Sequence, residues 1–131
     1  MKKIALALLF IFCLLPLAGA KAQKQRQTNP CENAPSQYEA DECAHKQYVA
    51  ADAELNKFYN QLASKLEDQE QRAQLKAAEL AWIKYRDADC EFASAFYKGG
   101  TIRPMIESFC KTDVTKARAA ELRQQIEVFE Q

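Results

Sequence analysis

Residues 36–98, SQYEADECAHKQYVAADAELNKFYNQLASKLEDQEQRAQLKAAELAWIKYRDADCEFASAFYK, decide the fold because they contain neither glycine nor proline. The stretch is rich in Ala, Leu, Glu, Gln and Lys, which have high helix propensity. At its start Ser36 and Glu39 have the spacing of a capping box, in which each side chain satisfies a free backbone amide. The sequence therefore predicts an all-α protein.

Two apolar stripes run through this stretch at spacings of three and four residues. The first consists of Tyr48, Leu55, Phe58, Tyr59, Leu62 and Leu66, and the second of Leu75, Ala78, Trp82, Tyr85, Phe92 and Phe96. Residues 67–71 between them are wholly polar, and Asp68 can cap a new helix. One straight helix would expose both stripes, so we expect a long antiparallel helical hairpin that turns near residues 67–70.

The hairpin turn also predicts a register, in which facing residue numbers sum to about 137. Leu62 then lies opposite Leu75, and Leu55 lies opposite Trp82. Asp52 lies opposite Tyr85 and Arg86.

The chain after the hairpin predicts a shorter C-terminal helix. Residues 98–100 (KGG) end the second helix with a glycine where a left-handed backbone is needed. We expect residues 101–110 to be a connection with one helical turn after Pro104. Thr112 or Asp113 would then cap the last helix, whose apolar face carries Val114, Leu122, Ile126 and Phe129.

Residues 1–20 have the pattern of a secretory signal peptide. Lys2 and Lys3 precede an apolar run over residues 4–17, and residues 18–20 (AGA) offer a cleavage site, with residues 20–22 (AKA) as a second. The run of about 14 residues is too short to span a bilayer, which takes roughly 20. We expect a periplasmic or secreted protein with no membrane attachment after the signal is removed.

Residues 21–35 are polar, contain two prolines and read as a flexible leader before a helical domain over residues 36–131. Cys13 lies inside the signal. Ile11 and Phe12 precede it in place of the small residues that lipid attachment requires, so we expect Cys13 to leave with the signal peptide.

Four cysteines remain, and an even number in a short exported chain predicts two disulfides. Local pairing would join Cys31 to Cys43 and Cys90 to Cys110. Crossed pairing would join Cys43 to Cys90 and Cys31 to Cys110, and the local pairing is slightly favoured. Zinc is not expected, because no Cys-x-x-Cys pair exists and His45 is the only histidine.

Charge and motif content argue against several functions. Loss of Lys2 and Lys3 leaves 16 basic against 18 acidic residues, or 15 against 18 if Lys21 also goes. A mildly acidic protein is unsuited to nucleic acid or an anionic membrane. No Ser-His-Asp set or phosphate-binding loop is present. We therefore expect neither an enzyme nor a cofactor.

Three charged residues fall on or beside the apolar stripes, namely Asp52, Asp89 and Arg118. A buried charge needs a partner. We expect Asp52 or Asp89 to pair with Arg86 or Arg118 and fix the packing of the helices. The alternative is a polar pocket that binds a small ligand.

Two motifs carry a family resemblance. Asp52-x-x-Leu55-Asn56 is followed by residues 82–90, WIKYRDADC, and then by Cys110, Arg118 and Leu122. From about Cys31 to Leu122 the chain resembles the LprI-like lysozyme inhibitor domain family of exported bacterial proteins, although it lacks the lipobox of the lipoprotein that names the family.

The resemblance implies a helical, disulfide-bonded extracytoplasmic domain that, in some members, inhibits lysozyme. The candidate functional residues on the matching motifs are Asp52, Asn56, Trp82, Tyr85, Arg86, Asp87 and Arg118. The function predicted is binding and inhibition of a lysozyme-type muramidase by surface contact. The alternative is an envelope interaction or structural module that binds another protein or a toxin.

Overall fold

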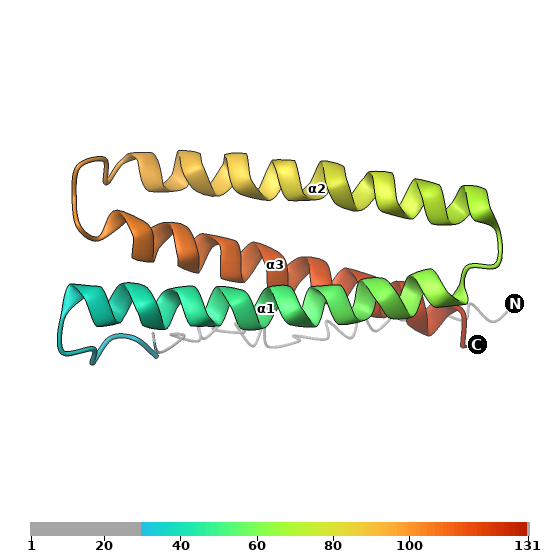
Figure 1. Cartoon of the computed structure of the whole chain (residues 1–131), viewed down its shortest axis with the longest axis horizontal. Coiled ribbons are helices and arrows are strands. Elements are labelled where there is room, and N and C mark those ends of the chain that lie inside the picture. The colour runs from blue at the N-terminus through green and yellow to red at the C-terminus, as the bar shows by residue number, and fades with distance from the viewer. Residues whose placement is uncertain (1–29, 131) are drawn as a thin grey trace, which may run out of the picture.

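The structure, a computed structural model, describes residues 30–130, which form three long helices and no strand (Figure 1). These are α1 (Gln37–Lys65), α2 (Gln69–Ala95) and α3 (Arg103–Val128). α2 runs antiparallel to α1, and α3 returns in the direction of α1. The all-α hairpin with an additional C-terminal helix is confirmed. The predicted signal peptide, Cys13 and most of the predicted leader lie outside the described residues.

Ser36 and Asp68 cap α1 and α2 as the sequence predicts, although the Glu39 carboxylate accepts from the Ser36 hydroxyl, at 3.0 Å, and not from a backbone amide. The Ser36 hydroxyl accepts a hydrogen bond from the backbone amide of Glu39 at 3.3 Å. Asp68 Oδ1 accepts from the backbone amides of Glu70 and Gln71 at 2.6 and 3.3 Å. Each cap satisfies amides that the first helical turn leaves without a partner. The hairpin therefore turns over residues 66–68, as expected.

The connection between α2 and α3 is shorter than the sequence analysis predicts. Gly99 has a φ of +81°, the left-handed conformation expected of it. However, α3 begins at Arg103 and not near Thr112, because Pro104 lies in the first turn, where its missing amide costs nothing. With 26 residues, α3 is only slightly shorter than α2, which has 27.

The closest packing in the molecule joins α1 to α3, whose Cα atoms approach within 8 Å along their length. α2 packs less closely on α3, and it approaches α1 least. At one end of α1 the buried side chains are small, namely Ala40, Ala44 and Ala51, and those of α3 are Thr112, Thr115 and Ala119. Small side chains on both helices allow the two backbones to come close together.

Larger apolar residues fill the other end, toward the α1–α2 turn. Leu55 and Leu62 of α1 form a buried cluster with Ala119, Leu122 and Ile126 of α3. Leu75 and Trp82 of α2, with Phe58 and Tyr59 of α1, pack against its edge. The predicted pairs Leu62–Leu75 and Leu55–Trp82 thus belong to one core, although α3 supplies much of it. Phe129, expected on the buried face of α3, is 54% exposed.

The apolar stripe predicted for the second helix is wrong over most of its length. Ala78, Tyr85, Phe92 and Phe96 are exposed. The buried residues of α2 are Glu79, Arg86, Cys90 and Ser94, which share the opposite face. α2 therefore turns a mostly polar face toward the other helices and an apolar face outward.

Two disulfides join the local cysteine pairs, as favoured by the sequence. Cys31–Cys43 ties the segment before α1 to that helix, and Cys90–Cys110 ties α2 to α3. Their sequence separations of 12 and 20 residues correspond to a loop-entropy stabilisation of about 3 kcal/mol each.

Within the described part of the chain, no helix combines the length and the apolar character that crossing a bilayer requires.

The small residues between α1 and α3 give a testable prediction. Ala51→Leu should lower the free energy of unfolding by about 1–3 kcal/mol, because a larger side chain forces the two backbones apart. Ala53→Leu, at an exposed position of the same helix, should change it by less than about 0.5 kcal/mol. Urea unfolding followed by circular dichroism measures both. Equal effects of the two substitutions would contradict the close packing.

Candidate functional site: the Arg86 cluster

Arg86 is the most buried cation of the described chain, with 5% of its surface exposed, and it joins α2 to α1. Its Nη1 donates to Asp52 Oδ1 of α1 at 3.1 Å, and its Nε donates to Asp87 Oδ1 at 3.0 Å. The pairing expected between Asp52 and Arg86 is therefore present. We call Tyr48, Asp52, Trp82, Arg86 and Asp87 the Arg86 cluster.

The Asp52-x-x-Leu55-Asn56 motif supplies the α1 side of this contact. Asn56 lies one helical turn after Asp52 and donates to its carboxylate Oδ2 at 3.0 Å and to its backbone carbonyl at 2.8 Å. These bonds hold Oδ1 toward Arg86. Leu55, on the adjacent face, enters the apolar core. The motif therefore combines a core residue with an oriented carboxylate.

Aromatic rings cover the Arg86 guanidinium. Its Cζ lies 5.2 Å from the ring centre of Tyr48 on α1 and 5.3 Å from that of Trp82, one turn earlier on α2. A guanidinium over an aromatic face is stabilised by the ring quadrupole and, unlike an ammonium, tolerates partial dehydration. The two rings therefore make burial of this cation favourable.

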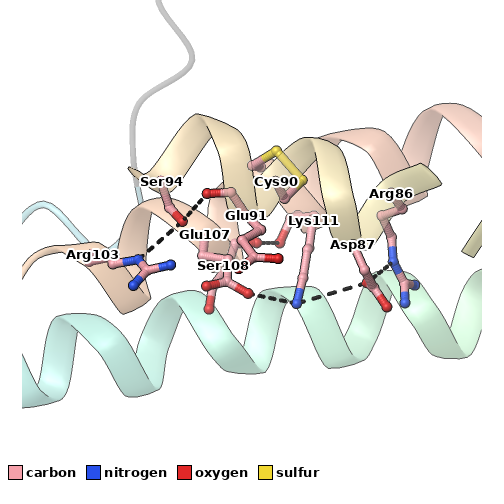
Figure 2. Close-up of polar contacts among 11 residues, drawn as sticks. Arg86, Asp87, Cys90, Glu91, Ser94, Arg103, Glu107, Ser108 and Lys111 are labelled. Carbon is pink, nitrogen blue, oxygen red and sulfur yellow. Dashed lines mark hydrogen bonds and ion pairs between the residues drawn. A yellow bond between two sulfur atoms is a disulfide. The ribbon is translucent and has the colours of Figure 1, made fainter. Parts of the chain in front are cut away.

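The cluster continues onto α3 through Lys111 (Figure 2). Lys111 Nζ lies 2.8 Å from Glu107 Oε1 and 3.8 Å from Asp87 Oδ1. It also lies 5.9 Å from the Tyr48 ring centre. Side chains of all three helices thus meet at one point, with positive and negative charges alternating.

The surroundings shift two pKa values. Burial raises the pKa of Tyr48, and the nearby carboxylates of Asp52 and Asp87 raise it further, while the Arg86 cation opposes them. For Arg86, burial alone would lower the pKa. Its hydrogen bond with Asp87, its interaction with Tyr48 and its hydrogen bond with Asp52 outweigh that effect, so the Arg86 pKa is raised. At neutral pH the cluster therefore holds a protonated Tyr48 and a charged Arg86.

A second ion pair joins α2 to α3 further along the bundle. Arg118 donates from both Nε and Nη2 to Glu79 Oε2 at 3.1 Å, and from Nη1 to Glu121 Oε2 at 2.9 Å. The pairing of Arg118 with Asp52 or Asp89, which the sequence analysis allowed, is therefore wrong. Its partner Glu79 was missed.

Near the Gly99 turn, a third polar contact links the same two helices. Arg103 Nε donates to the hydroxyl of the buried Ser94 at 3.4 Å, and that hydroxyl donates to the backbone carbonyl of Glu91 at 3.0 Å (Figure 2). The Cys90–Cys110 disulfide lies between this contact and the Arg86 cluster in the sequence of α2. α2 is thus attached by polar contacts spread over several turns.

The motif residues do not all meet. Tyr85 is 58% exposed and lies about 100° around α2 from Arg86, so it is not part of the cluster. Tyr48, Lys111 and Glu107, which do belong to the network, were not predicted. Tyr48 could have been found from its position one turn before Asp52, whereas the two α3 residues depend on where that helix begins.

The chemistry open to this site is limited by the pairing of its charges. The Arg86 cation contacts two carboxylates, and Lys111 contacts two as well, which suits an internal contact between helices more than capture of a small ligand.

One grouping in the described range, Asp89 with Cys90 and Cys110, has the compactness of a metal site. Its two sulfurs are joined in the disulfide and are not thiolates, so they do not fit a metal.

A helical domain braced by local disulfides and by an internal arginine cluster is the class of protein that the structure defines. A model of the family described as lysozyme inhibitor LprI matches residues 28–122, and the chain belongs to this family. An uncharacterized protein of Rhizobium meliloti (strain 1021) is 36% identical over 126 residues, which are 87% of this chain and 91% of that protein. No solved structure matches the chain.

Substitution of Arg86 tests the cluster as a structural contact. Arg86→Leu should cost about 2 kcal/mol of unfolding free energy, less than for a fully buried pair because both carboxylates are partly exposed. Arg86→Lys should cost about 1 kcal/mol, since it keeps the charge but loses the planar contacts. Arg123→Leu, which breaks an exposed pair with Glu127, serves as the control and should cost less than about 0.5 kcal/mol. An Arg86→Leu protein as stable as the control would contradict this role.

The raised pKa of Tyr48 predicts a pH dependence. A group whose pKa is higher in the folded than in the unfolded state stabilises the fold at low pH, and this stabilisation is lost as pH rises through the folded pKa. Stability should therefore fall above about pH 10, the ordinary value for tyrosine. Tyr48→Phe should make that fall shallower, while Tyr38→Phe at an exposed position should not. Urea unfolding from neutral to alkaline pH measures the difference, and parallel curves for parent and Tyr48→Phe would refute it.

Proposed function

We propose that this protein is an extracytoplasmic binding protein that inhibits lysozyme-type muramidases by surface contact. The observation that carries the proposal is the family match over residues 28–122, which covers both disulfides, the Arg86 cluster and Arg118. The family's description names an inhibitor, so binding to a protein partner is the general function that follows from it. Lysozyme as the partner is the finer part of the proposal.

The charge of the chain supports a cationic partner. Without Lys2 and Lys3 the protein carries two more acidic than basic side chains, from 16 against 18. Complementary charge increases the rate of association between proteins. Animal lysozymes are cationic, so electrostatic attraction would favour their encounter with this chain. With an excess of two acidic side chains, the effect is modest.

The form of the molecule supports contact through its surface. The charged groups at the centre of the bundle are paired with one another and hold the helices together. What remains for a partner is the outside of three rigid helices. A pre-organised surface of this kind loses little conformational entropy on binding, which favours a stable inhibitory complex.

A turbidity assay of cell-wall lysis tests the proposal. Purified mature protein at micromolar concentrations should slow the clearing of a bacterial cell-wall suspension by lysozyme. The inhibition should weaken as salt is added, because screening reduces the attraction between the acidic inhibitor and the cationic enzyme.

The control is the same protein after reduction and alkylation, which removes both disulfides and should abolish inhibition. Absence of inhibition toward animal and bacterial lysozymes alike would reject the proposal. A stable complex with a different envelope protein, isolated by pull-down, would then support the interaction module considered as the alternative.

A further inference from the structure

The outward side of α2 is an apolar surface that no described helix covers. It consists of Ala81, Tyr85, Ala88, Phe92, Ala95 and Phe96, which we call the outer face of α2. Phe92 and Phe96 are 68% and 80% exposed, and their rings contact each other at 5.7 Å between centres. Because successive residues are about 100° apart on a helix, this face lies opposite the buried Arg86 and Cys90. Contiguous exposed apolar surface of this kind marks an interaction site.

The order of residues on the outer face is that of a helix-pairing seam. Ala81, Ala88 and Ala95 recur every seven residues, and Tyr85 and Phe92 lie between them, four residues after one alanine and three before the next. This alternation of four and three is the spacing by which two helices pack side by side. Large and small side chains alternate along the seam, so an aromatic ring of one helix fits over an alanine of the other.

The charges beside this seam favour a second copy of the chain as the occupant. Lys84 and Glu91 are exposed, lie on the same flank of the outer face one heptad apart, and form no ion pair within the described chain. If two α2 helices pack antiparallel, Lys84 of each lies next to Glu91 of the other. The symmetry makes this contact twice.

We propose that the outer face of α2 is the interface of a symmetric antiparallel homodimer. Facing residue numbers then sum to about 173, with the two-fold axis near Asp87. Tyr85 lies over Ala88 of the second copy, and Phe92 lies over its Ala81. The same register brings Lys84 close to Glu91, so size and charge agree on one arrangement.

Sedimentation velocity and light scattering of the full mature protein test this interface. The parent should approach twice the monomer mass over micromolar to millimolar concentrations, and Phe92→Asp should weaken the dimer by about tenfold or more. Val49→Asp is the matched control. Val49 is 52% exposed and belongs to α1, not to the outer face of α2, so its substitution should leave the dimer unchanged.

A charge exchange tests the register. Lys84→Glu and Glu91→Lys should each weaken the dimer several-fold, because each places like charges together at two points. The double variant Lys84→Glu, Glu91→Lys should restore it. Circular dichroism of every variant confirms that the monomer fold is retained, as expected for exposed positions.

Two results would overturn the proposal. One is a parent protein that stays monomeric over the whole concentration range. The other is a Phe92→Asp variant that dimerises as the parent does. If that variant also loses binding to a muramidase, the outer face of α2 belongs to the contact with a different partner. Either result leaves the inhibition assay of the purified protein unaffected as a separate test of function.

Discussion

The close approach of α1 and α3 is the constraint on which the remaining structure depends. Small side chains on both helices bring the backbones together at one end, and leucine and isoleucine fill the other. This packing uses most of the buried apolar surface, so α2 is attached through a different set of contacts. Those contacts are Arg86 with Asp52, Arg118 with Glu79, and the disulfide to Cys110. A helix attached in this way can turn its aromatic side outward without losing its place in the bundle.

The sequence predicts the helices and their ends more reliably than the faces they bury. Ser36, Asp68 and Gly99 act locally, through a few backbone groups, so their roles follow from residue type and position. Periodicity predicted the wrong buried face over most of α2. Its aromatic side looked like core, whereas the polar side is buried because Asp52, Lys111 and Arg118 offer partners there. The predicted start of α3 is wrong because the helical turn expected after Pro104 does not end there but continues without a break through Thr112.

The part of the candidate site that depends on the hairpin register was predicted from the sequence. Counting from the turn placed Asp52 opposite Arg86, and the ion pair follows from that. Tyr48 and Trp82 complete the site by stacking, which spacing alone does not distinguish from packing in a core. Glu107 and Lys111 come from α3, whose position required the packing of all three helices. The geometry shows that most of the motif residues hold the helices together.

The two disulfides join consecutive cysteines of the described chain, Cys31 with Cys43 and Cys90 with Cys110. A chain that is oxidised from its N-terminus, as its thiols emerge one after another, reaches this connectivity without breaking a wrong bond. Cys90 emerges only after Cys31 and Cys43 are both present and able to form their disulfide. Thiol exchange, which reshuffles mispaired cysteines, is then not needed for correct assembly. Cys13 is the one thiol that could disturb this order, since it precedes Cys31, and its removal before oxidation would keep the pairing sequential.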